Sequence, residues 1–212
     1  MKGHSFSSGQ QRLILLNTIF TTVLVVSNFL SAKVANLWGF LFPAGTIGYA
    51  ITFLVTDIIS EQYGKEESQK AVFRGAIALV ISFALAKIAI LLPGQAQGAD
   101  DAYRSIFDSA TRVMAGSVCG YLASQSLDIV IFHRIKKATN GKYKFLRNNV
   151  GTITSQIVDT VIFSFVAFYG LVPNIWSLIL DLIIAKTILA ILDTPFFYLF
   201  TRRPVAKENE EA

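Results

Sequence analysis

Residues 175–200 have the sequence IWSLILDLIIAKTILAILDTPFFYLF, and this apolar run decides the fold. A helix needs about 20 mostly apolar residues to cross the hydrocarbon core of a bilayer. Arg202 and Arg203 follow the run and close it with positive charge. We therefore expect a transmembrane helix here, and not the core of a soluble domain.

Five similar runs precede this one, so the whole chain has the pattern of a multi-pass membrane protein. They span residues 13–30, 37–59, 73–92, 113–132 and 152–172. Charged residues make up 16% of the 212 residues, whereas a soluble domain carries about 25%. We predict an all-α integral membrane protein with six transmembrane helices in residues 11–203, between a flexible tail at 1–10 and a charged tail at 204–212.

The first two runs each have an alternative interpretation. Residues 13–30 could be a signal peptide, but the run is long and no small-residue cleavage site is evident before Lys33. The second run is interrupted by Pro43, Gly45 and Gly48. Either a helix simply begins near Pro43, or a broken helix exposes its backbone to a cavity. The sequence favours the simple helix start.

A short amphipathic segment lies between the third and fourth runs. Tyr103, Ile106, Phe107 and Ala110 recur at the spacing of one helical face. We expect this segment to lie on the membrane surface.

Basic residues are distributed unevenly between the two sides that six spans would create. One side would hold fourteen of them and the other side only Lys33, Arg104 and Arg112. The fourteen are Lys2, Arg12, Lys65, Lys70, Arg74, Arg134, Lys136, Lys137, Lys142, Lys144, Arg147, Arg202, Arg203 and Lys207. Basic loops mark the cytoplasmic side, so we predict a protein of the cell membrane with both termini in the cytoplasm.

Several classes of function are disfavoured by the sequence. The net charge of +5 is explained by cytoplasmic loops, so nucleic-acid binding is not needed to account for it. His4, His133 and the single Cys119 have no neighbouring ligands of the kind that form metal sites. We find no serine-hydrolase, zinc-protease or Walker A motif. We therefore expect no catalytic residues, no metal and no cofactor, and the chain cannot itself be the ATPase of a pump.

Two predicted spans carry matching stripes of polar and aromatic side chains. The fifth span has Gln156, Asp159, Thr160 and Phe163 on one helical face. The fourth span has Tyr121, Gln125, Asp128 and Phe132 on one face. These spans flank one loop and run antiparallel. At the helical rise of about 1.5 Å per residue, the Gln and Asp side chains of both stripes would lie roughly 6–11 Å above the inner membrane edge.

The stripes allow a ligand site or a purely structural role. An ionisable side chain at the centre of a membrane helix costs about 2.5–3.5 kcal/mol, so it should face a partner or a watery cavity. Carboxylate, amide, hydroxyl and ring together suit a flat, hydrogen-bonding heterocycle. Alternatively, the stripes only bond helix to helix, and Asp159 with Lys186 forms a structural ion pair. We favour the ligand site when both stripes are taken together.

An ordered set of short motifs resembles the queuosine precursor transporters, which are also catalogued as vitamin uptake transporters. The motifs are Ser27-Asn28, Thr56-Asp57, Gln125 to Asp128 with Phe132 and Arg134, Asp159-Thr160 with Phe163, Ala167-Phe168, and Lys186. The resemblance covers about residues 20 to 200. Gln156 and Asp181 depart from the pattern expected of the family.

This resemblance implies import of queuosine and archaeosine precursors, 7-cyano- or 7-aminomethyl-7-deazaguanine, for tRNA modification. It also implies a fold similar to the substrate-binding components of energy-coupling-factor transporters. Together with the stripes, it predicts a site composed of Asn28, Gln125, Asp128, Phe132, Gln156, Asp159, Thr160, Phe163 and Lys186.

Two alternatives to this function remain open. The chain could be a substrate-binding component for another vitamin or nucleobase, driven by separate ATPase subunits, or it could be a membrane-embedded enzyme or assembly factor. Small residues of the fourth span, Ala115, Gly116 and Gly120, permit close helix contact. They allow either a homodimer or coupling subunits as partners.

Overall fold

The computed structural model describes residues 7–31, 33–37, 40–94, 98–107, 110–170 and 174–202. Within these residues the chain forms helices and one short hairpin. In chain order the elements are α1 (Ser8–Leu30), β1 (Val34–Leu37), β2 (Phe40–Pro43), α2 (Thr46–Tyr63), α3 (Lys65–Leu91), α4 (Ala99–Phe107), α5 (Ala110–Ala138), α6 (Lys144–Phe168) and α7 (Ile175–Phe200).

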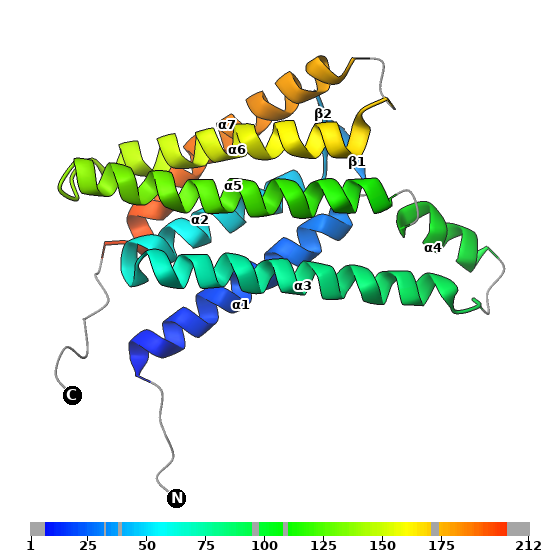
Figure 1. The fold of residues 1–212 in the computed structure, drawn as a ribbon, viewed down its shortest axis with the longest axis horizontal. Coiled ribbons are helices and arrows are strands. Elements are labelled where there is room, and N and C mark those ends of the chain that lie inside the picture. The colour runs from blue at the N-terminus through cyan, green and yellow to red at the C-terminus, as the bar shows by residue number, and fades with distance from the viewer. Residues whose placement is uncertain are drawn as a thin grey trace, which may run out of the picture.

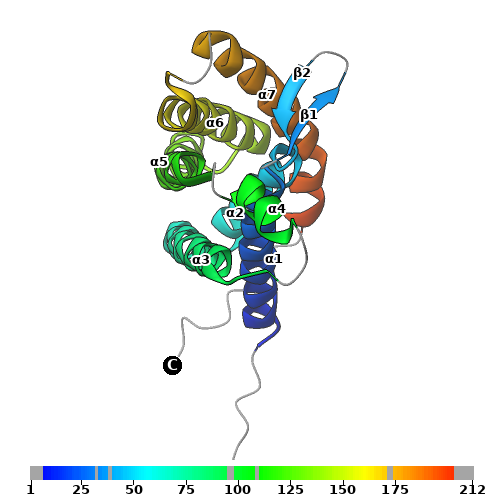
Figure 2. The same ribbon diagram turned by 90° about the vertical axis from the view of Figure 1, so that its right-hand side faces the viewer.

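The long helices run side by side in two layers. Seen along the bundle in Figure 2, α3, α5 and α6 stack in one layer, and α1, α2 and α7 lie against it. Helix α2 packs against α1, α3, α5 and α7, which makes it the central element. Figure 1 shows the start of α1, the α5–α6 connection and the end of α7 at one end of the bundle, and the hairpin and α4 at the other.

The fold is confirmed as all-α apart from the hairpin, and five helices suit a membrane. Helices α1, α3, α6, α7 and the 115–138 part of α5 are long and apolar enough to cross one. Helix α2 is not among these five, because its buried face carries polar side chains, including Thr52, Thr56, Asp57 and Ser60. Within the described residues, composition therefore establishes five candidate spans, and not the predicted six.

The start of the second predicted span is wrong. Leu37 and Phe40–Pro43 belong to an antiparallel hairpin in which Val34 pairs with Pro43 and Leu37 with Phe40. Helix α2 begins only at Thr46 and then runs unbroken through Gly48, as the simple-start interpretation predicted. Pro43 lacks an N–H group and so cannot donate within a helix, which suits it to the last position of an edge strand.

The predicted amphipathic segment divides between two helices. Helix α4 contains Tyr103 and Phe107, whereas Ala110 already belongs to α5. The side chain of Asp100 accepts a hydrogen bond from the backbone N–H of Gly94 at 2.7 Å, which fixes the start of α4 against the end of α3. Its position on the membrane surface remains a prediction.

Many polar side chains lie in the interior beside an apolar cluster that includes Phe20, Leu24 and Ile59, and large apolar side chains also cover the outside. Ser124, Gln125, Ser155 and Thr160 are completely buried. Large apolar side chains, such as Leu91 at 81% exposure, face outward. A soluble protein could not tolerate so large an apolar surface, whereas a bilayer solvates it.

Close packing of α1 against the start of α2 generates a stability prediction. A Cβ atom at Gly45 would lie 1.9 Å from the backbone oxygen of Ser27 and 2.3 Å from the hydroxyl of Ser31. The φ of Gly45 is −67°, which any residue can adopt, so only this contact opposes a side chain. We expect Gly45→Ala to lower stability by about 1–3 kcal/mol, the cost of overpacking.

Thermal unfolding of the detergent-purified protein measures this effect. Val26→Ile is the matched control, because it adds one carbon to α1 at a side chain that is 47% exposed. An unfolding midpoint for Gly45→Ala equal to those of Val26→Ile and the wild type would contradict the packing described.

Candidate functional site

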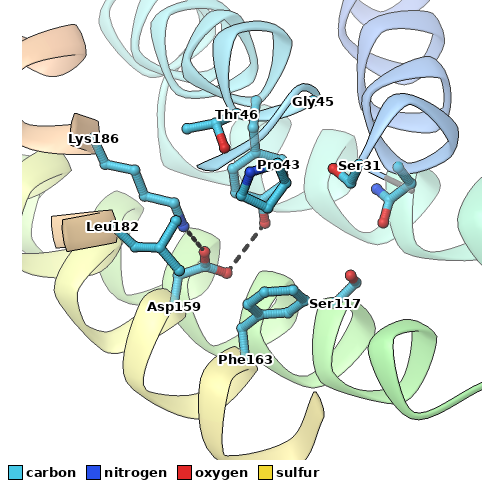
Figure 3. Close-up of a pocket in the computed structure, with 11 residues that line it drawn as sticks. Ser31, Pro43, Gly45, Thr46, Ser117, Asp159, Phe163, Leu182 and Lys186 are labelled. Carbon is cyan, nitrogen blue, oxygen red and sulfur yellow. Dashed lines mark hydrogen bonds and ion pairs between the residues drawn. The ribbon is translucent and has the colours of Figure 1, made fainter. Parts of the chain in front are cut away.

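A pocket lies at the end of the bundle that carries the hairpin. Six elements line it: Asn28 and Ser31 at the end of α1, Pro43 of β2, Gly45, Thr46 and Tyr49 at the start of α2, Ser117 of α5, Asp159 and Phe163 of α6, and Leu182 and Lys186 of α7. Figure 3 shows the carboxylate of Asp159 beside the ammonium of Lys186, and the ring of Phe163 between Asp159 and Ser117.

The charged centre of the pocket is a buried ion pair. Lys186 Nζ lies 2.6 Å from Asp159 Oδ2, and the two side chains are 11% and 6% exposed. The pair predicted from the sequence is therefore present. An unpaired charge at this depth would carry a large desolvation cost. The attraction between the two opposite charges offsets this cost for both residues.

Tyr49 completes the environment of the Asp159 carboxylate. Its hydroxyl donates to Asp159 Oδ1 at 3.2 Å, and the Lys186 ammonium lies 5.4 Å from the centre of its ring. The hydroxyl of Ser124 lies 3.5 Å from the same oxygen. Gly120 allows this approach, because a Cβ atom there would lie 2.9 Å from Asp159 Oδ1. The carboxylate is thus fixed in position before any ligand arrives.

Four of the nine predicted site residues line this pocket. They are Asn28, Asp159, Phe163 and Lys186. The amide nitrogen of Asn28 donates to the backbone oxygen of Leu24 at 3.0 Å. No hydrogen bond to its side-chain oxygen is seen within the described part of the chain, so this oxygen can accept one from a ligand.

The other five predicted residues lie elsewhere in the bundle, so the two stripes do not share one cavity. Gln125 accepts from the Thr56 hydroxyl at 3.2 Å, which links α5 to α2. The hydroxyl of Thr160 donates to the backbone oxygen of Gln156 within its own helix. Phe132 and Asp128 pack farther from the hairpin. The structural alternative of helix-to-helix bonding therefore describes the α5 stripe.

Two further polar layers lie between this pocket and the opposite end. In the first, the hydroxyl of Thr152 donates to Asp57 Oδ2 at 3.2 Å, and the hydroxyl of Ser155 donates to Asp128 Oδ1 at 3.0 Å. The second is centred on Glu61, which pairs with Lys136 at 3.0 Å, Lys144 at 3.6 Å and Arg147 at 2.5 Å.

The arrangement of acidic residues does not suit a metal ion. Among the residues that the structure describes, no three His, Cys, Asp or Glu side chains gather as a set of metal ligands. The chemistry available in the pocket is one carboxylate, one ammonium, several hydroxyls, an amide and two aromatic rings. Such a set can bind a polar ring.

Comparison with known proteins gives the family. Residues 43–200 match the family described as "Putative vitamin uptake transporter". The chain belongs to this family. This membership and the apolar helices make it a multi-pass membrane protein.

Individual relatives in bacteria carry a more specific name. The chain is 29% identical over 178 residues to the "Probable queuosine precursor transporter" of Bacillus subtilis (strain 168), covering 82% of this chain and 78% of the relative. It is 26% identical over 158 residues to the "Queuosine precursor transporter" of Escherichia coli (strain K12), covering 74% of this chain and 69% of the relative. No solved structure matches.

Several residues of this family member's pocket were missed by the sequence analysis. Tyr49, Thr46 and Ser31 come from the segments that flank the hairpin. Helical periodicity could not connect them with Asp159, because they lie on other elements more than a hundred residues away. The interrupting Pro43 and Gly45 were the available signal, since both line the pocket.

The ion pair generates a prediction about stability. Lys186→Met or Asp159→Asn alone leaves the other partner buried and uncompensated, which costs about 3–5 kcal/mol for buried pairs. The double variant leaves no isolated charge, so it should unfold at a higher temperature than either single variant. Thermal unfolding in detergent of all four proteins measures the coupling. Strictly additive effects would show that the two residues do not stabilise each other.

Proposed function

We propose that the chain is a membrane transporter that imports 7-deazaguanine precursors of queuosine, such as 7-cyano- and 7-aminomethyl-7-deazaguanine. Two observations support this function. Relatives that match most of the chain are named for this substrate class. The observation that carries most weight is the pocket, in which a fixed carboxylate faces an aromatic ring inside the bundle.

The pocket has the groups that a deazaguanine needs. The ring N–H and the exocyclic amino group of guanine-type bases form one edge with two parallel donors, which a carboxylate accepts. Asp159 is the acceptor for this edge, and Phe163 stacks on the face of the base. Asn28 and Ser117 are placed to bond other ring substituents. A wholly apolar ligand would leave these groups unpaired.

Binding requires the pocket to open. Its free space is about 50 Å³, whereas ligand pockets hold roughly 300 Å³ or more. The hydroxyl of Tyr49 now occupies Asp159 Oδ1, one of the two oxygens that the base would use. The base therefore displaces this hydroxyl, while Lys186 keeps the carboxylate charged. Because Tyr49 belongs to α2, replacement of its hydroxyl by the base couples substrate binding to a movement of α2.

We also propose that the chain crosses the membrane six times, through the five candidate spans and through α2. The start of α2 lies against the end of α1, because a Cβ atom at Gly48 would be 2.2 Å from Ser27 Oγ. The end of α2 lies beside the start of α1, because the hydroxyl of Tyr63 donates to the backbone oxygen of Gly9 at 3.0 Å. The two helices thus cover the same thickness, and the 18 residues of α2 extend about 27 Å.

With six spans, the loop charges favour cytoplasmic termini and a pocket on the outer side of the cell membrane. The cytoplasmic end is then closed by the cluster around Glu61 and by Arg12, whose guanidinium donates to the backbone oxygen of Phe200 at 2.9 Å. This arrangement fits a carrier that receives its substrate from outside.

A substrate-binding component that works with separate ATPase subunits is the alternative, for another vitamin or nucleobase. The family description favours vitamins in general, and the named relatives favour queuosine precursors. Similarity to energy-coupling-factor components, a homodimer and coupling subunits all remain proposals. A carrier rather than an enzyme is the simplest role for this pocket.

Titration of 7-cyano-7-deazaguanine into the detergent-purified protein tests the substrate. Asp159→Asn puts a donor against the donors of the base and should weaken binding about tenfold or more, since an unpaired buried group costs about 1–3 kcal/mol. Phe163→Leu should weaken it less, because apolar contact survives. Tyr49→Phe should bind at least as well as the wild type, because no hydroxyl has to be displaced.

Two controls make this titration specific. Asp181→Asn is the same substitution on α7 at a side chain that does not line the pocket, so its affinity should be unchanged. Adenine lacks the two-donor edge and should not compete. Equal affinities of folded Asp159→Asn and the wild type, or competition by adenine, would refute the assigned site.

Reporter fusions at Gly9 and Lys207 test the topology. Both should report the cytoplasm, because an even number of spans returns the chain to its starting side. Opposite locations would mean that α2 does not cross the membrane. Two external locations would reverse the orientation.

A further inference from the structure

Between the pocket and the Glu61 cluster, two carboxyl groups meet in the interior. Asp57 of α2 and Asp128 of α5 are each 1% exposed, and they interact with each other as neighbouring acidic groups. Helix α6 holds both, with Thr152 donating to one and Ser155 to the other. None of these four residues lines the pocket.

The hydrogen bonds at this pair leave one oxygen of each carboxyl group without a donor. Asp57 Oδ1 and Asp128 Oδ2 are both buried and unpartnered. The hydroxyl groups satisfy the other two oxygens and are neutral. Two carboxylate oxygens are both acceptors, so they can approach each other stably only when one of them carries a proton.

Among the described residues, no ion pair joins a positive side chain to either aspartate. The charged neighbour from α7 is Asp193, which adds another acidic group and also has an unpartnered oxygen. Four described cations of the bundle already have carboxylate partners: Arg147, Lys136 and Lys144 bind Glu61, and Lys186 binds Asp159. Two adjacent uncompensated charges in a membrane interior would be far too costly, and one bound proton removes most of that cost.

We propose that Asp57 and Asp128 form a proton-binding site that holds one proton between them, and that this proton drives import. The site follows from the geometry of the pair alone. The coupling to import rests on the function proposed above.

The position of the pair suits such coupling. Ser155 is one helical turn from Asp159 of the pocket, and Asp57 is one turn from Glu61 at the cytoplasmic end. The bound proton therefore lies between the substrate and the cluster that closes the exit. When the bonds of Glu61 to Arg147 and Lys136 open, water reaches the pair, and the proton passes from the carboxyl group to that water.

Infrared spectroscopy of the full chain in lipid tests the site without any substrate. At neutral pH the wild type should show the carbonyl band of a protonated carboxylic acid, and raising the pH should abolish it. Asp57→Asn and Asp128→Asn remove the like-charge neighbour, so the remaining acid should ionise at lower pH in both variants. Asp181→Asn, which changes a carboxyl group outside the pair, should behave as the wild type.

Several results would overturn the proton site. One is the absence of the band, and another is a band whose pH dependence is the same in both variants as in the wild type. Loss of the band on adding sodium at constant pH would assign the oxygens to a metal cation instead. Each variant should elute as a single species in size-exclusion chromatography, which shows that it is folded. Agreement between two separate substitutions excludes misfolding of one variant as the cause of the result.

Proteoliposomes test the coupling, with the membrane potential clamped at zero. An alkaline interior should concentrate 7-cyano-7-deazaguanine about tenfold for each pH unit, the limit for one proton per base. Asp128→Asn should still bind the base but should not concentrate it. A wild type that binds the base and ignores the gradient would overturn the coupling. A wild type that does not bind the base would count against the proposed function, and the infrared result would still decide the proton site.

Discussion

The cost of burying charge in a membrane organises this protein. Each acidic side chain inside the bundle must find a cation, a proton or a set of hydrogen bonds. Asp159 has Lys186 and the hydroxyl of Tyr49. Glu61 has three cations at the end of the bundle. Between them, Asp57 and Asp128 have only hydroxyl groups and each other.

These three arrangements divide the interior into layers with different chemistry. The ion pair at the hairpin end fixes a carboxylate that can select a base. The cluster at the other end links α2, α5 and α6 through a single glutamate. The acidic pair in the middle connects the same three helices, so a change of its charge acts on the elements that form both ends. A carrier needs such a connection to open one end at a time.

Much of this arrangement could be predicted from the sequence, because intramembrane charge is rare and therefore informative. The apolar runs located the long helices, and the isolated Lys186 indicated its partner Asp159. The hairpin was missed because residues 34–43 are as apolar as the helix that follows, and composition does not distinguish a short strand from a helix. Both stripes were predicted to line one cavity. Of the stripe residues, only Asp159 and Phe163 line it.

The remaining errors have a geometric origin. A helical stripe defines a face, but it does not say which neighbour that face meets. Gln125 lies on the same face as Asp128 and meets Thr56 of α2, which no local pattern reveals. Tyr49 was invisible for the same reason, since its importance depends entirely on how α2 crosses α6. Pairings between elements distant in sequence come only from the folded bundle.

The central claim is that the base enters from outside the cell and binds beside Asp159. Thiol labelling tests both parts together. In a Cys119→Ser background, Ser117→Cys places one thiol in the pocket wall. A membrane-impermeant maleimide added to intact cells should label it, and 7-cyano-7-deazaguanine should slow the labelling. Labelling only from the cytoplasmic side, or labelling at a rate that the base does not change, would contradict the account.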